Sequence, residues 1–103
     1  MKIQVLMDAV YSASDTIVVR QVEDLTIIIP LTPGIDDTEN KPYILNATGQ
    51  IIWKQLNGRK KLNKIVTDLA ATFKMPVGVI KKDVTGFVRE LLNRKMLVKI
   101  AKT

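Results

Sequence analysis

The pattern of apolar and polar residues changes its period near the middle of the chain. Before residue 46 the apolar residues gather in short, β-branched runs, which are typical of strands. These runs are Thr16–Val22, Leu25–Ile29 and Tyr43–Leu45. Only Glu23-Asp24 separates the first two runs, so we expect them to pair as an antiparallel hairpin. The pattern therefore predicts a three-stranded antiparallel sheet.

After residue 46 the apolar residues recur at helical spacing. Asn46 is a suitable N-cap for a first helix, which Asn57-Gly58 ends. Two amphipathic helices follow, from about Leu62 to Phe73 and from about Val77 to Arg94, and Met75-Pro76 separates them. The predicted core face of the third helix is Ile80, Val84, Phe87 and Leu91. This order of elements indicates an α+β fold, with a three-stranded antiparallel sheet followed by three helices, like a winged helix.

The remaining stretches are the two ends and one loop. Residues 1–13 form an N-terminal extension that fits either a strand or a tail folding onto another surface, and residues 14–103 form the main domain. Met96–Ile100 predicts a short extended wing or tail. Residues 32–40 are turn formers and acids, which indicates a surface loop. In a simple meander the strand after this loop lies at an edge, where its unpaired backbone groups are either a liability or a docking site.

The composition excludes most catalytic chemistry. The chain contains no cysteine and no histidine, which removes thiolate chemistry, the commonest general base and the commonest metal ligand. Asp36-Asp37 are expected to be solvated turn residues rather than a cation site. We therefore expect no catalytic residue, no metal site and no cofactor. The sequence shows neither a signal peptide nor an apolar run long enough for a membrane span, so the expected location is the cytoplasm.

The charge is divided unevenly between the two halves of the chain. The net charge is +6, but residues 1–45 carry three bases and seven acids, whereas residues 46–103 carry thirteen bases and three acids. A helical half this basic either binds an anionic partner, such as nucleic acid, an acidic peptide or a membrane surface, or presents ordinary solvated lysine faces. Composition alone leaves both alternatives open.

The third helix has two unlike flanks beside its predicted core stripe. One flank comprises Lys81, Thr85, Val88 and Leu92. The other flank is smaller and acidic, with Val79, Asp83, Gly86 and Glu90. The first flank either forms the wall of a partly apolar groove, with a basic rim from Lys81, Arg89 and Lys95, or Val88 and Leu92 simply widen the core face.

One stretch of the sequence resembles a known family. The run from Tyr43 to Trp53 contains the pattern Leu-Asn-x-Thr-Gly-x-x-x-Trp. The two preceding strand runs and the spaced apolar residues up to Leu97 continue the match. On these residues the chain resembles the PqqD family, named for a protein of pyrroloquinoline quinone biosynthesis, over residues 16–98.

The resemblance implies a peptide-recognition module rather than an enzyme. Such domains bind the leader of a ribosomally made precursor peptide and present its core to a modifying enzyme, often a radical SAM protein. The leader is taken up as an extra strand on the third strand, in a groove against the third helix. Carried over to this chain, the docking edge comprises Pro42, Tyr43, Ile44 and Leu45, and the opposing wall comprises Lys81, Thr85, Val88, Arg89 and Leu92. The basic rim favours an acidic leader, and strand addition of this length predicts a dissociation constant on the order of micromolar.

The competing prediction is a winged-helix DNA-binding transcriptional regulator. Three short helices, a wing and a basic last helix fit such a protein on coarse grounds. Against it, the third helix lacks the cluster of Arg, Asn and Gln that reads base edges, and offers mainly Val, Gly, Thr and Lys.

Three roles remain open for residues 1–13. They could add a strand, form a homodimer contact, or occupy the groove in the free protein.

Overall fold

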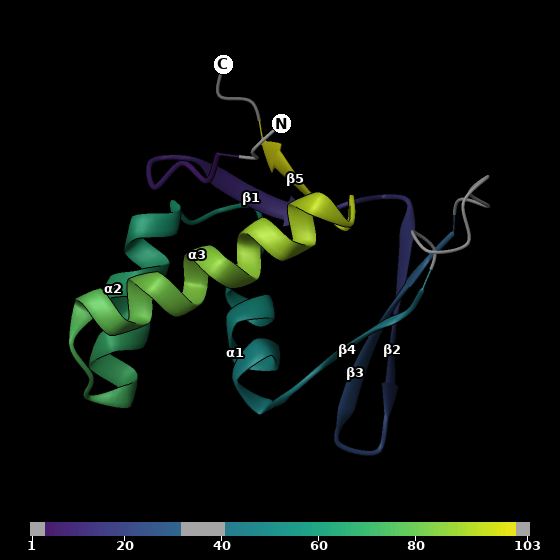
Figure 1. The fold of residues 1–103 in the computed structure, drawn as a ribbon, viewed down its shortest axis with the longest axis horizontal. Helices are drawn as coiled ribbons and strands as arrows, with labels where there is room; N and C mark the ends of the chain where they lie inside the picture. The colour runs from purple at the N-terminus through teal and green to yellow at the C-terminus, as the bar shows by residue number, and fades with distance from the viewer. Residues whose placement is uncertain (1–3, 32–40, 101–103) are drawn as a thin grey trace.

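The computed structural model describes residues 4–31 and 41–100, which form an α+β fold (Figure 1). The strands are β1 (Val10–Ala13), β2 (Ile17–Val22), β3 (Leu25–Pro30), β4 (Tyr43–Leu45) and β5 (Leu97–Ile100). The helices are α1 (Ala47–Gln55), α2 (Leu62–Phe73) and α3 (Val77–Asn93). The predicted fold class, a three-stranded antiparallel sheet followed by three helices, is confirmed. The predicted loop at 32–40, with Asp36-Asp37, lies outside the described residues.

The three-stranded sheet has the order β2-β3-β4 and is antiparallel throughout. Alternate residues of a strand point to the same face, and the inner face buries Thr26, Ile28 and Leu45. The opposite face leaves Val22 and Ile44 at least half exposed. Because β3 is the central strand, β4 lies at an edge of the sheet, as the meander pattern predicts.

A second, two-stranded sheet brings together the first and last described strands. β1 pairs antiparallel with β5, and Val10 lies opposite Ile100 (Figure 1). Tyr11 of β1 is only 2% exposed and belongs to the main core. Its hydroxyl accepts a hydrogen bond from the backbone N–H of Leu6 at 3.0 Å. Residues 5–13 thus pack into the domain, and β5, which lies within the predicted wing, pairs with β1.

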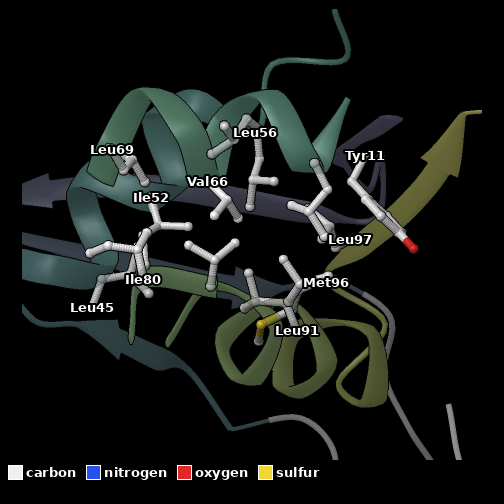
Figure 2. Packing of buried hydrophobic residues seen from close by; sticks show 14 of the residues in the cluster. Tyr11, Leu45, Ile52, Leu56, Val66, Leu69, Ile80, Leu91, Met96 and Leu97 are labelled. Carbon is white, nitrogen blue, oxygen red and sulfur yellow. The ribbon is translucent and has the colours of Figure 1, made fainter. Parts of the chain in front are cut away.

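The helices supply most of the core, which packs around the inner face of the sheet (Figure 2). The fully or nearly fully buried helical residues are Ile52 of α1, Leu62, Ile65, Val66 and Leu69 of α2, and Ile80, Val84, Val88 and Leu91 of α3. Ala70 of α2 is also buried, and Phe73 is half-buried at the end of this helix, so the apolar residues of α2 recur at the helical spacing expected from the sequence. Burying one large aliphatic side chain stabilises a fold by roughly 1.5–3 kcal/mol, so this cluster holds the three helices in place.

The junction between β4 and α1 contains a single residue. Asn46 follows the last residue of β4, and its side-chain oxygen accepts a hydrogen bond from the N–H of Gly49 at 2.7 Å. The predicted N-cap is therefore confirmed. Because no loop separates the strand from the helix, the direction of β4 and the start of α1 are fixed together.

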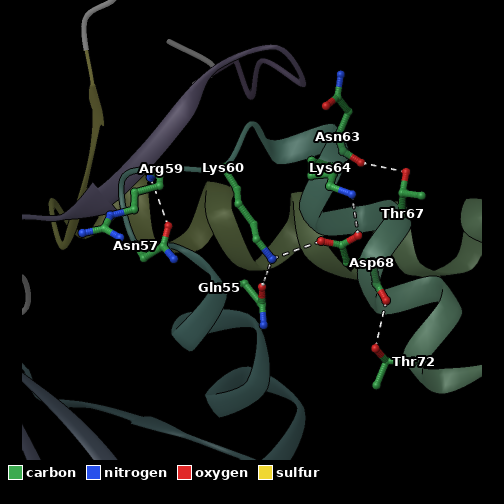
Figure 3. A network of polar contacts seen from close by, with 9 residues as sticks. All are labelled: Gln55, Asn57, Arg59, Lys60, Asn63, Lys64, Thr67, Asp68 and Thr72. Atoms are coloured by element: carbon green, nitrogen blue, oxygen red, sulfur yellow. Dashed lines mark hydrogen bonds and ion pairs between the residues drawn. The ribbon is translucent and has the colours of Figure 1, made fainter.

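A polar link connects α1 with α2 (Figure 3). Lys60 Nζ donates hydrogen bonds to Gln55 Oε1 at 2.9 Å and to Asp68 Oδ2 at 3.0 Å. Lys64 Nζ lies 3.1 Å from the other carboxylate oxygen of Asp68. The hydrogen bond from Lys60, and then the one from Lys64, lowers the pKa of Asp68 below its ordinary value. The side chains are partly exposed, so the effect on stability is modest.

The lowered pKa gives this link a defined pH dependence. The ionised form of Asp68 stabilises the fold above the unfolded-state pKa of about 4, and this stabilisation is lost as the pH falls through the lower folded-state pKa. We expect the wild type to be more stable than Asp68→Asn near neutral pH, and the difference to shrink in acid. Urea unfolding across this pH range measures the effect. Asp15→Asn is the control, because Asp15 makes no ion pair with a described residue. A difference that does not change with pH would contradict the assignment.

Candidate functional site

A groove lies between the edge of β4 and helix α3. It contains a cavity of about 380 Å³. The lining residues come from β4, the start of α1 and the middle of α3, and they are Tyr43, Ile44, Leu45, Asn46, Thr48, Gly49, Ile52, Asp83 and Phe87. In Figure 1, β4 runs directly into α1, which lies below α3 in this view. The groove thus combines a strand edge, a helix start and a helix face.

The strand at this groove has a free edge. Within the described residues, β4 pairs with β3 on one side and with no strand on the other. Ile44 is 58% exposed, while its neighbour Leu45 is buried in the core. Pro42 precedes the strand and is exposed. An edge with unpaired backbone N–H and C=O groups can accept a further strand.

Helices α1 and α3 approach each other closely at Gly49. A Cβ atom at this position would lie 3.2 Å from Cε1 of Phe87 and 3.2 Å from Oδ1 of Asn46. These distances are shorter than nearly all real Cβ contacts, so glycine lets the ring of Phe87 lie against the backbone of α1. Phe87 is half-buried and, with Asp83 one turn earlier, forms the α3 wall of the cavity.

The other end of the strand is covered by the C-terminal end of α3. The guanidinium carbon of Arg94 lies 4.5 Å from the centre of the Tyr43 ring, a cation–π contact. Nε of Arg94 also donates a hydrogen bond to Oε2 of Glu90 at 2.8 Å. Tyr43 is therefore held by a side chain from α3 and not only by its own strand.

The two predicted halves of the site lie differently with respect to the groove. The strand residues Pro42, Tyr43, Ile44 and Leu45 lie at the free edge of the sheet, as expected. The predicted wall residues Lys81, Thr85, Val88, Arg89 and Leu92 do not line the cavity. Their peptide contacts stay a prediction that the geometry does not support.

Val88 corrects the predicted position of the core stripe on α3. It is 0% exposed and lies in the core, so the expectation that it lies beside the stripe is wrong. Phe87, predicted as core, is half-buried; it packs against the core and also lines the groove. Leu92 packs against the core, which favours the alternative that these residues widen the core face. On the acidic flank, Asp83 lines the cavity and Glu90 binds Arg94, which lies over Tyr43 of β4.

A chain of side-chain hydrogen bonds joins α1 to the sheet on the side of α1 away from the groove. Gln21 Nε2 donates to Thr26 Oγ1 at 2.8 Å, and Thr26 Oγ1 donates to Gln50 Oε1 at 3.0 Å. Gln50 Nε2 then donates to the carbonyl oxygen of Asp24 at 2.7 Å. The half-buried Trp53 lies on the same side of α1 and packs against the core. These contacts hold α1, and with it the start of the groove, against β3.

Metal and membrane sites are not seen in the described part of the chain. No group of three or more His, Cys, Asp or Glu in residues 4–31 and 41–100 is placed to hold a metal ion. No helix in these ranges is long and apolar enough to cross a membrane. The groove offers hydrogen bonding along a strand, apolar contact and one carboxylate.

Comparison with protein-family models identifies the chain's family. The model for coenzyme PQQ synthesis protein D (PqqD) matches residues 35–97, which is more than half of the chain. The chain belongs to the PqqD family. The matched PqqD region includes β4, all three helices and every residue that lines the groove.

A solved structure shares the PqqD-type fold described above. The chain described as TbiB1 in complex with the TbiA(beta) leader peptide superposes with a TM-score of 0.70 and is 24% identical in sequence. The match covers 88% of this chain and 99% of that chain. At this identity the likeness shows a common fold. Among curated proteins, no sequence matches this chain significantly.

The close approach at Gly49 predicts unequal effects of two alanine substitutions. Gly86→Ala lies in open space on α3 and should raise the free energy of unfolding by about 0.5–1 kcal/mol, because alanine favours a helix. Gly49→Ala gains the same preference but crowds Phe87 and Asn46, so we expect it to be at least about 1 kcal/mol less stable than Gly86→Ala. Urea unfolding measures both. Equal stabilisation would show that the helices do not meet at Gly49.

The burial of Val88 predicts a loss of stability on truncation. Val88→Ala removes two buried methyl groups and should lower the free energy of unfolding by about 2 kcal/mol. Thr85→Ala, a change on a less buried face of the same helix, should stay within about 0.5 kcal/mol of the wild type. The same urea series tests both variants. If Val88→Ala left the free energy of unfolding unchanged, the burial of Val88 would be contradicted.

Proposed function

We propose that this protein is a non-catalytic peptide-binding domain. It captures the leader of a ribosomally made precursor peptide by strand addition to β4 and presents the peptide to a modifying enzyme. The observation that carries the proposal is the free edge of β4 beside a cavity walled by α3, in a chain of the PqqD family. The TbiB1 structure, described as a complex with a leader peptide, supports the same class of ligand.

The groove gives a strand-shaped ligand two kinds of contact. Backbone hydrogen bonds to β4 supply affinity that does not depend on sequence. Alternate side chains of the added strand then face either the cavity, beside Phe87, or the outer face of the sheet, beside the exposed Ile44. Selectivity comes from these side-chain contacts, and the expected dissociation constant is on the order of micromolar because ordering the peptide opposes binding.

The proposed contacts of the leader on the strand side are Pro42, which precedes β4, and Tyr43, Ile44 and Leu45, which line the cavity. On α3 the proposed contacts are the cavity residues Asp83 and Phe87. The modifying enzyme is expected to bind a different surface, so that the leader stays in the groove during presentation. By family resemblance, a radical SAM protein is a suitable candidate for this enzyme.

An NMR titration with N-methylated peptides tests strand addition. The probe is a synthetic peptide from a short reading frame beside the gene, and it should shift signals of residues 42–46 and 83–87. Methylating the backbone nitrogens of alternate residues on one strand edge removes their hydrogen bonds. Each lost bond should weaken binding about three- to tenfold, whereas methylation on the other edge should have little effect.

Two controls make the titration decisive. A random DNA duplex should give no shifts; shifts along α3 that weaken steeply with salt would instead indicate a nucleic-acid binder. A peptide that binds equally well after methylation on either edge would overturn strand addition. Ile44→Pro and Tyr43→Pro give the same test from the protein side, because adjacent N–H groups of a strand point in opposite directions and only one of the two faces outward.

A further inference from the structure

Two pairs of an acid and an aromatic ring lie where α3 faces β4. In one pair Glu90 is on α3 and Tyr43 is on β4, and Arg94 links them at the end where β4 begins. The other pair is Asp83 with Phe87, which are one helical turn apart and both line the cavity. The two acids lie on the same flank of α3, but the ring comes from β4 in the first pair and from α3 in the second. The pairs also differ in whether the chain itself supplies a cation.

At the first pair the cation belongs to the protein. The guanidinium of Arg94 lies over the Tyr43 ring at 4.5 Å and is hydrogen-bonded to the Glu90 carboxylate at 2.8 Å. An aromatic face attracts a cation through its quadrupole, and the carboxylate adds an ion pair. At this end of the groove a guanidinium is therefore held between an acid of α3 and a ring of β4.

At the second pair, no described side chain supplies a cation as Arg94 does at the first. Asp83 makes no ion pair with any residue in 4–31 or 41–100. Among the described residues that line the cavity, it is also the one that carries a charge. The neighbouring Asn46 oxygen accepts the N–H of Gly49, and Thr48 adds a hydroxyl. The carboxylate of Asp83 and the hydroxyl of Thr48 can each accept a hydrogen bond from an N–H donor in the cavity.

The N-terminus of α1 favours an anion in the cavity, but its effect is weaker than that of the Asp83 carboxylate. A helix N-terminus carries a partial positive charge of about half a unit, which favours anions. Asp83 carries a full negative charge in the same cavity, and Asn46 already accepts one of the first N–H groups of α1. The balance of charge at this end of the groove is therefore negative.

We infer that the cavity at Asp83 and Phe87 selects a lysine or arginine side chain of the bound peptide. This inference rests on the proposed function and specifies its ligand. It reverses the expectation of an acidic leader, because the basic rim of Lys81, Arg89 and Lys95 does not line the cavity. Alternate residues of an added strand face α3, and only the one opposite Asp83 can reach its carboxylate. The selection therefore applies to one peptide position.

A peptide display experiment tests the inference without knowledge of the natural leader. Random twelve-residue peptides are selected on the wild-type protein, and the binders are synthesised and measured by fluorescence anisotropy. Each lysine or arginine is then changed to glutamine in turn. We expect one position at which this change weakens binding about three- to tenfold on the wild type, the size of a partly exposed ion pair with a cation–π contact. On Asp83→Asn the same change should have less than about a twofold effect.

Charge reversal and a matched control complete the design. On Asp83→Lys, a peptide with glutamate at the selected position should bind better than its lysine counterpart. Asp15→Asn removes the same charge from an exposed turn outside the cavity and should leave the lysine preference unchanged. The preference should also shrink at high salt, because exposed charges are screened.

The possible failures are distinguishable. Binders that lose affinity on N-methylation of one strand edge, but show no cationic position sensitive to Asp83, would overturn this inference and leave the proposed function standing. A preference for glutamate on the wild type would show that the start of α1 dominates the cavity. If no selected peptide depends on the edge of β4, the proposed function fails and the inference fails with it.

Discussion

The contact between the backbone of α1 at Gly49 and the ring of Phe87 sets the geometry of the groove. Asn46 fixes the start of α1 directly after β4, so the strand and the helix share one orientation. Gly49 then allows α3 to lie close enough for Phe87 and Asp83 to face that strand. A side chain at residue 49 would widen the separation of the helices or displace the ring. The width of the groove thus depends on the absence of one Cβ atom.

Helix α3 has a different chemistry on each face. Its core face holds Ile80, Val84, Val88 and Leu91, its groove face holds Asp83, Phe87, Glu90 and Arg94, and its exposed residues include Lys82 and Arg89. The net charge of +6 therefore says little about the groove, because the free bases and the groove lie on different sides of the helix. Local placement of charge, rather than the total, determines what a site attracts.

Local features of the sequence predicted most of the fold. Short β-branched runs, the N-cap at Asn46 and the apolar spacing of α2 all depend on neighbours within a few residues, so they could be read in order along the chain. The pairing of β1 with β5 could not, because nothing near Tyr11 indicates a partner at the other end. The position of Val88 was predicted wrongly for a related reason. Phe87 and Val88 are adjacent and both apolar, and only the position of β4 decides which of them is fully buried and which also lines the groove.

The pairing of β1 with β5 has a consequence for how the chain folds. The hairpin of β2 and β3 and the two later helices can form from local contacts, with a small loss of chain entropy. The terminal sheet instead closes a loop that contains nearly every described residue, from Val10 to Ile100. During synthesis, Tyr11 emerges long before its partner strand and cannot make this pairing until β5 has left the ribosome. Native packing of this end is therefore expected late in folding, after the strand and helices of the groove have had time to assemble.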